Sequence, residues 1–183
     1  MKKLFAILLS AALMLTCLTA CGGGSGGSGK GGSSSYEAAL DLYFKCMAGE
    51  ASKAEFKKTK PDQHWSYIEQ EEEGSLEESY QAMQEEAADF MEEAEYEVGK
   101  NVKITYEVVD KEKWSDDQME DYRENFDGLK EEYGVNMSGN KLQAVYTLEL
   151  EVTLKGSEGK ESFVVEAEVL QYDGNWFITN MDF

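Results

Sequence analysis

Positive charge is scarce in this chain of 183 residues, which holds 17 lysines and arginines against 37 aspartates and glutamates. The formal net charge is −20, and Arg123 is the only arginine. Binding to nucleic acid starts with neutralising phosphates, and an anionic lipid surface also attracts basic segments. We therefore expect no nucleic-acid partner, and we expect the folded part to stand off an anionic leaflet.

Motifs of catalysis and metal binding are also missing. His64 is the only histidine, and its neighbours have no spacing typical of a metal site or a catalytic pair, so we expect it at the surface or at a helix end. The acidic runs at 69–73 and 116–121 lack the calcium-loop pattern. Phosphate loops, zinc cysteine pairs and serine-nucleophile elbows do not occur. The sequence predicts no catalytic residue, no metal site and no cofactor.

One long apolar run is present, from Leu4 to Leu15, and it follows two lysines. It is too short to span a bilayer, which takes about 20 residues, but it has the length of the apolar part of a signal peptide. The run leads into Leu18-Thr19-Ala20-Cys21. That stretch resembles the lipobox of bacterial lipoproteins.

The lipobox resemblance implies cleavage after Ala20, so that residues 1–20 form the signal peptide. It also implies a lipidated Cys21 carrying two or three acyl chains, palmitate among them, which together hold a protein durably in a membrane. We then expect a cell-envelope protein anchored in the cell membrane and facing outside the cytoplasm, in an envelope of one membrane or two. The alternatives are an ordinary secretory signal, with Cys21 incidental, and an uncleaved membrane helix.

The segment after Cys21 consists almost entirely of glycine and serine up to residue 35. Such a composition behaves as a flexible linker, so we expect a lipidated tether over 21–35. The remaining 36–183 has the length of a single domain. Because Cys17 would leave with the signal peptide, Cys46 has no partner for a disulfide. It lies beside the apolar stripe of a core-facing helix, and we interpret it as a small hydrophobe, with a nucleophile as the alternative.

Hydrophobic periodicity predicts an α+β domain. Helical spacing predicts helices over 36–47, 52–57, 61–67, 76–94 and 115–133, and alternation predicts strands over 101–110 and 142–154. Two turns, at 156–159 and at Asp173-Gly174, then set the register of an antiparallel sheet. The pairs predicted from these turns are Val152 with Phe163, Leu150 with Val165, Leu148 with Ala167, Tyr146 with Val169, Val169 with Ile178, and Gln171 with Trp176.

This order of elements resembles the cystatin-like and NTF2-like α+β folds. The resemblance is strongest at Tyr172-Asp173-Gly174-Asn175-Trp176-Phe177-Ile178, which is similar to the terminal hairpin of small bacterial lipoproteins of that fold, and Met47-Ala48-Gly49-Glu50 fits the same families. It implies N-terminal helices wrapped by a curved antiparallel sheet of about four strands.

Two groups of residues are candidates for a binding site. Aromatic side chains assigned to a pocket lining are Tyr106, Tyr122, Tyr133, Tyr146 and Trp176. Apolar side chains at one end of the opposite sheet face, assigned to a partner surface, are Leu170, Tyr172, Phe177 and Met181.

The leading hypothesis is a lipid-anchored, non-catalytic module that binds a small molecule or a protein partner, which could be a second copy of the chain. One alternative is an enzyme with an NTF2-like pocket. Such proton-transfer enzymes combine a carboxylate with tyrosines, and no acid falls on the predicted inner face. Another alternative is a structural spacer at the cell surface.

Overall fold

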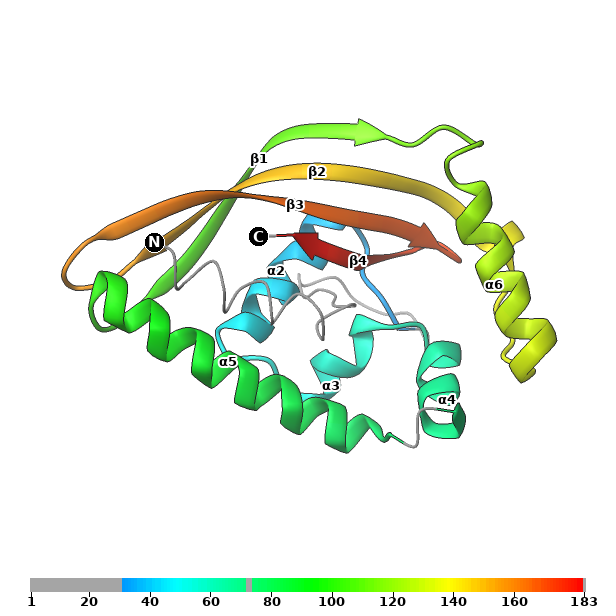
Figure 1. The fold of residues 1–183 in the computed structure, drawn as a ribbon, viewed down its shortest axis with the longest axis horizontal. Helices are drawn as coiled ribbons and strands as arrows, with labels where there is room; N and C mark the ends of the chain where they lie inside the picture. The colour runs from blue at the N-terminus through cyan, green and yellow to red at the C-terminus, as the bar shows by residue number, and fades with distance from the viewer. Residues whose placement is uncertain (1–30, 72–73, 183) are drawn as a thin grey trace.

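The computed structural model describes residues 31–71 and 74–182. They form an α+β domain of five α-helices and one open, four-stranded antiparallel sheet in the order β1-β2-β3-β4 (Figure 1). The helices are α2 (Tyr36–Met47), α3 (Lys53–Phe56), α4 (Asp62–Glu71), α5 (Leu76–Val98) and α6 (Glu120–Tyr133). The strands are β1 (Lys103–Lys113), β2 (Leu142–Lys155), β3 (Lys160–Tyr172) and β4 (Asn175–Asp182).

The predicted signal peptide, Cys21 and residues 22–30 of the predicted tether lie outside the described residues. Within the described ranges, no helix is both long enough and apolar enough to cross a membrane. The backbone N–H of Gly32 donates to the carbonyl oxygen of Lys58 (3.1 Å), and Ser33 forms a bridge with Trp176 of β4. Contacts with the domain therefore begin before Tyr36.

Serine side chains begin three of the helices. Ser35 accepts a hydrogen bond from the backbone of Ala38 before α2, Ser52 forms a capping box with Glu55 before α3, and Ser75 caps α5. The helix predicted from residue 115 begins only at Glu120, because residues 116–119 form a turn instead.

The register predicted for the last three strands is confirmed. A four-residue loop and a two-residue turn fix it, as the alternation of apolar residues requires. The observed pairs are Val152 with Phe163, Leu150 with Val165, Leu148 with Ala167, Tyr146 with Val169, Val169 with Ile178, and Gln171 with Trp176.

Two irregularities in the sheet move side chains to the face opposite the predicted one. The register shifts between Leu142 and Ala144 and between Glu168 and Val169. A shift of one residue exchanges the two faces of a strand. Leu142 was predicted on the same face as Leu148, but it packs in the core on the other face of the sheet. Met181 was predicted on the partner surface, but it packs in the main core.

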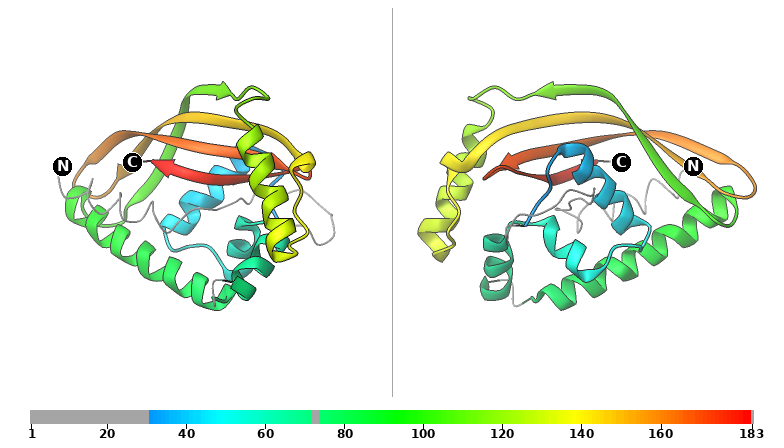
Figure 2. Two further views of the ribbon diagram at one scale, coloured as in Figure 1. Left: turned by 45° about the vertical axis from the view of Figure 1, so that its right-hand side comes forward. Right: turned by 180° about the vertical axis from the view of Figure 1, so that it is seen from behind.

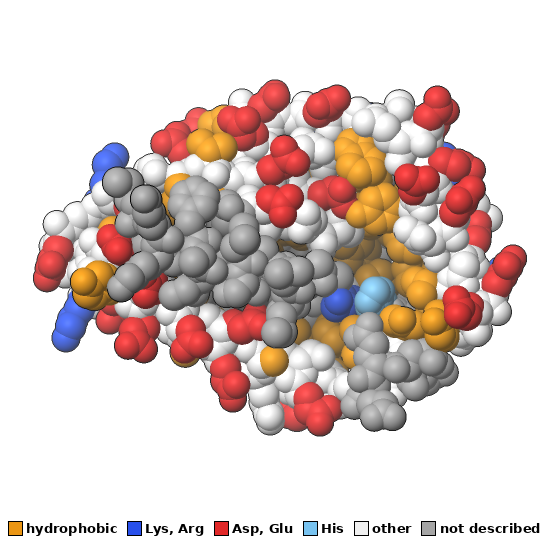
Figure 3. Space-filling model, in the orientation of Figure 1, with side chains coloured by type: hydrophobic (Ala, Val, Ile, Leu, Met, Phe, Trp, Pro, Cys, Tyr) orange, Lys and Arg blue, Asp and Glu red, His pale blue; other side chains and the backbone are white. Residues whose placement is uncertain are grey.

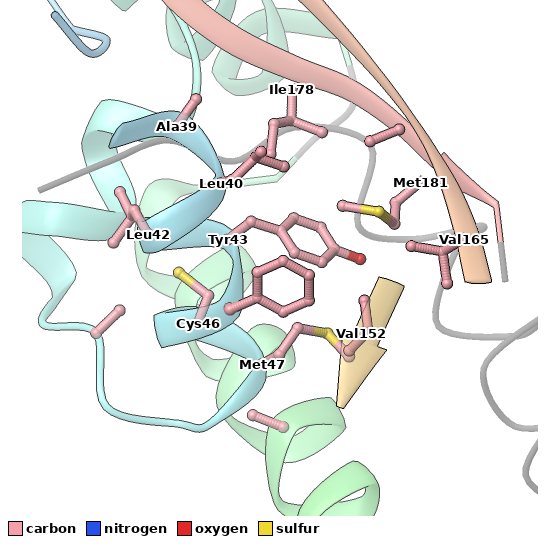
Figure 4. Close-up of a cluster of buried hydrophobic side chains, with 14 of the residues drawn as sticks. Ala39, Leu40, Leu42, Tyr43, Cys46, Met47, Val152, Val165, Ile178 and Met181 are labelled. Atoms are coloured by element: carbon pink, nitrogen blue, oxygen red, sulfur yellow. The ribbon is translucent and has the colours of Figure 1, made fainter. Parts of the chain in front are cut away.

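The two faces of the sheet carry separate apolar cores. α2 and α5 lie on the concave side of the curved sheet and enclose the main core with it (Figures 1 and 2). Figure 4 shows Tyr43 of α2 pointing across this core toward β4. The second core alternates with the first along β2, β3 and β4, and so faces the other way. Its buried members are Met119, Val135, Met137, Leu142, Val145, Leu170, Tyr172 and Phe177.

Helix α6 and the segment after it cover the surface predicted to meet a partner. Leu170, Tyr172 and Phe177 are each less than 5% exposed, and side chains of α6 such as Phe126 pack against their cluster. The expectation that these residues form an exposed surface is therefore wrong. The chain covers them itself.

Candidate functional site

A small hollow lies along β4, an end strand of the sheet, between α4 and α6. We call it the β4 hollow; its volume is about 140 Å³. Figure 3 shows this recess beside the single histidine, bordered by hydrophobic side chains. Its lining residues are Thr59, Pro61, His64, Tyr122, Phe126, Met137, Leu170, Tyr172, Phe177, Ile178 and Thr179.

Aromatic rings form a large part of its walls. Tyr122 and Phe126 stand four residues apart on α6 and so project from the same face of the helix. The ring of Phe126 meets the ring of Tyr172 edge to face, with 5.1 Å between centroids. Phe177 comes from β4, the strand that follows the Asp173-Gly174 turn. The hollow is thus an apolar space held by a helix on one side and a hairpin on the other.

A polar cluster stands at one side of the hollow. The hydroxyl groups of Tyr122 and Thr179 both donate to Oε1 of Glu168. Thr179 is the extra residue at the bulge of β4, because Val169 pairs with Ile178 while Glu168 pairs with Asn180. Bulges often re-aim a side chain beside a functional site.

Thr59 contributes a buried hydroxyl that is not satisfied. Its side chain is fully buried, and its Oγ1 has no hydrogen-bond partner in the described part of the chain. A buried polar group left without a partner costs about 1–3 kcal/mol. Thr59 is one of the residues that line the β4 hollow.

His64 lies in the first turn of α4, a helix end as predicted, but it lines the hollow. Its ring meets the ring of Tyr67 edge to face, with 5.9 Å between centroids. Burial, and then the positive charge of Lys60, lower the pKa of His64 to about 4. The imidazole is therefore neutral at neutral pH and presents one donor and one acceptor.

The depressed pKa of His64 predicts acid sensitivity. Between pH 6.5 and about 4 the unfolded chain binds a proton at this residue and the folded chain does not, so stability falls as the pH is lowered through this window. We expect a loss of about 2–3 kcal/mol between pH 7 and pH 4.5 from this residue. Urea unfolding at both pH values should show this extra loss in the natural chain but not in His64→Gln. Equal losses in the two proteins would contradict the assignment.

The structure distributes the predicted pocket-lining aromatics over several places. Tyr122 lines the β4 hollow, whereas Tyr106 lines a separate groove of about 700 Å³ between α2 and β1. The ring of Tyr133 packs against Tyr67, with 5.1 Å between centroids. Tyr146 and Trp176 contact each other elsewhere, with 5.7 Å between ring centroids. Thr59, His64 and Thr179 also line the hollow, and none of them was expected there from the sequence.

Other chemistry is sparse in the described ranges. Cys46 is buried in the main core, and burial raises the pKa of its thiol to about 12, which disfavours the reactive thiolate. Among residues 31–71 and 74–182, no three His, Cys, Asp or Glu side chains are grouped so as to hold a metal ion.

Comparisons of the chain with models of protein families, with curated proteins and with solved structures find no match. The function of the β4 hollow is therefore inferred from its own residues.

Proposed function

We propose that this chain is a lipid-anchored binding module, outside the cytoplasm, whose β4 hollow takes a small neutral molecule with a ring-sized apolar body and one polar group. The unpartnered hydroxyl of Thr59, a residue that lines this largely apolar hollow, carries this proposal. Binding sites for small molecules commonly combine apolar walls with a few placed polar groups.

The size of the hollow limits its ligand. Its volume of about 140 Å³ is close to that of an engineered apolar cavity of roughly 150 Å³ that holds benzene. A single ring or a short branched chain fits this space. An anionic group would lose its hydration without gaining an opposite charge, because the lining residues include no lysine or arginine. The carboxylate of Glu168, beside the hollow, already accepts hydrogen bonds from Tyr122 and Thr179.

Replacing Thr59 by valine tests the role of its hydroxyl. Valine has nearly the same shape, so Thr59→Val should raise the free energy of unfolding by about 1 kcal/mol, since the unsatisfied hydroxyl is gone. Phenol, the probe, should raise the melting temperature of the natural chain through binding. That shift should fall by more than half in the variant, as measured by calorimetry on the full chain in detergent.

The matched control is Thr105→Val. Thr105 is exposed and lines the groove between α2 and β1, so the same change there should leave the melting temperature and the phenol response unaltered. If this control loses the phenol response, phenol binds in that groove and not in the β4 hollow. A Thr59→Val protein that is less stable and binds phenol unchanged would overturn the proposal.

The cystatin-like or NTF2-like assignment belongs to the same proposal. It is supported by the curved sheet around α2 and α5 and by the terminal hairpin. Asp173 and Gly174 have φ values of 50° and 83°, and a two-residue turn of the kind that suits a twisted hairpin needs positive φ at both central residues.

Membrane attachment rests on the lipobox resemblance at Cys21. Intact-mass measurement of the protein extracted from cells that express the full chain should give an N-terminus at Cys21 carrying diacylglycerol. Any other N-terminus would remove the anchor from the proposal and leave the β4 hollow as it stands.

An enzyme is the second candidate, favoured by one observation. Glu168 accepts a hydrogen bond from Tyr122, so an acid does stand beside a tyrosine at the hollow. Proton abstraction needs a base of this kind within reach of the substrate. Turnover of the base-sensitive probe 5-nitrobenzisoxazole that disappears in Glu168→Gln would favour this candidate. If the natural chain and Glu168→Gln both convert the probe only at the uncatalysed rate, the non-catalytic binding module remains the proposal.

A further inference from the structure

Three aromatic side chains from different elements meet away from the β4 hollow. They are Tyr36 at the start of α2, Tyr146 of β2 and Trp176 of β4, and we call them the ring cage. The centroid of Trp176 lies 5.8 Å from that of Tyr36, at an interplanar angle of 72°, and 5.7 Å from that of Tyr146. All three side chains are only partly buried.

A cation from the same chain occupies the ring cage. Nζ of Lys111 lies 3.9 Å from the ring centroid of Tyr36 and 4.2 Å from that of Tyr146. Both distances are well inside the roughly 6 Å at which an ammonium group is attracted by the face of a ring. The two rings thus hold one positive charge between them.

The course of β1 explains how Lys111 reaches the rings. The register of β1 shifts between Val108 and Asp110, and beyond this bulge Lys111 pairs with Leu148, whose side chain is buried in the main core. Lys111 therefore faces the helices from an end strand, and its residue stays exposed to solvent. A flexible, solvent-accessible side chain can leave the rings without disturbing the core.

Acidic groups flank the same place. Glu37 follows Tyr36 directly, and Asp41 is one turn further along α2. The hydroxyl of Tyr106 donates to the backbone oxygen of Glu37 (3.1 Å) and to Oδ1 of Asp41 (2.8 Å). In a chain with a net charge of −20, these carboxylates favour the approach of small cations.

We propose that the ring cage is a binding site for a small organic ammonium compound, which displaces Lys111 from Tyr36 and Tyr146. Aromatic cages of this type recognise quaternary ammonium groups, because a soft cation touches several ring faces at once. Lys111 carries a positive charge, as the ligand does, and therefore competes with it for the same rings. This site is separate from the β4 hollow and does not depend on what binds there.

The test removes the competitor. Lys111→Ala in the full chain should bind tetramethylammonium about tenfold more tightly than the natural chain in isothermal titration calorimetry, since the rings no longer prefer their own lysine. Lys103→Ala removes the same charge from the far end of the same strand, where Lys103 is exposed and pairs with Lys155, and should bind as the natural chain does. Adding Tyr146→Leu to Lys111→Ala should abolish binding, whereas the phenol response should stay.

An uncharged compound of similar shape, tert-butanol, tests whether the ring cage recognises the positive charge of tetramethylammonium. It should not bind Lys111→Ala at the concentrations at which tetramethylammonium saturates the protein. If Lys111→Ala does not fold, Lys111→Gln removes the charge with less loss of side chain. Affinity equal to that of Lys103→Ala, or equal binding of tert-butanol, would show that Lys111 serves only to block pairing at the edge of β1, and would overturn the proposal.

Discussion

Replacing Leu150 by alanine is expected to lower the free energy of unfolding by about 3–5 kcal/mol. Leu150 is fully buried, lies in the middle of β2 and pairs with Val108 on one side and Val165 on the other. Both neighbours are held by the sheet, so the space left by the lost methyl groups cannot close easily. The cost therefore includes the cavity as well as the lost burial.

Val164 provides the matched control for this substitution. It lies on the neighbouring strand β3 but is 55% exposed and faces away from the main core. Val164→Ala should change stability by no more than about 0.5 kcal/mol. Urea unfolding followed by circular dichroism gives both values. Similar losses at the two positions would contradict the assignment of the sheet faces.

Gly156→Ala is the second substitution with a large expected effect, a loss of about 3 kcal/mol. A Cβ at Gly156 would lie 2.4 Å from the carbonyl oxygens of both Val98 and Gly99. The loop between β2 and β3 is fixed against the end of α5 there, since the backbone N–H of Glu158 donates to the oxygen of Val98 (2.9 Å). Backbone atoms on both sides of the clash are therefore held in place.

Gly159, at the other end of the same loop, tests the cause. A Cβ added there would meet no atom within 4 Å, so Gly159→Ala should cost less than about 1 kcal/mol. Thermal unfolding of the two variants should separate them by several degrees. Equal melting temperatures would mean that the loop and α5 do not touch as described.

The sequence was most informative about the last three strands. Leu148, Leu150 and Val152 alternate with polar residues, and two turns of defined length leave only one register that buries them. The position of α6 could not be predicted in this way. None of its residues is fully buried, so its apolar stripe does not indicate which surface it covers. The surface assigned to a partner is in fact covered by this helix.

The candidate site was predictable only in part. Tyr122 stood out as an aromatic side chain, but Thr59 is one polar residue in the lysine-rich segment 57–60 and resembles a surface residue. Thr179 reaches the hollow because of a bulge, and bulges leave no clear pattern in a single sequence. His64 lines the hollow only because α4, α6 and β4 meet there.

The chain enters the domain beside both proposed sites. The backbone N–H of Ser33 donates to the oxygen of Trp176 (3.2 Å), and that of Trp176 donates back to Ser33 (2.9 Å). Trp176 belongs to the ring cage, and Phe177, the next residue, lines the β4 hollow. In an anchored protein, both sites would therefore lie at the end of the domain that receives the tether.

Titration of the full chain with phenol, followed by NMR of methionine methyl groups labelled with ¹³C, tests the β4 hollow most directly. Met137 lines the hollow, whereas Met83 lies in the main core. The methyl signal of Met137 should shift until it saturates while that of Met83 stays in place, and Thr59→Val should weaken the change. No shift at Met137, or equal shifts at both residues, would contradict ligand binding in the hollow.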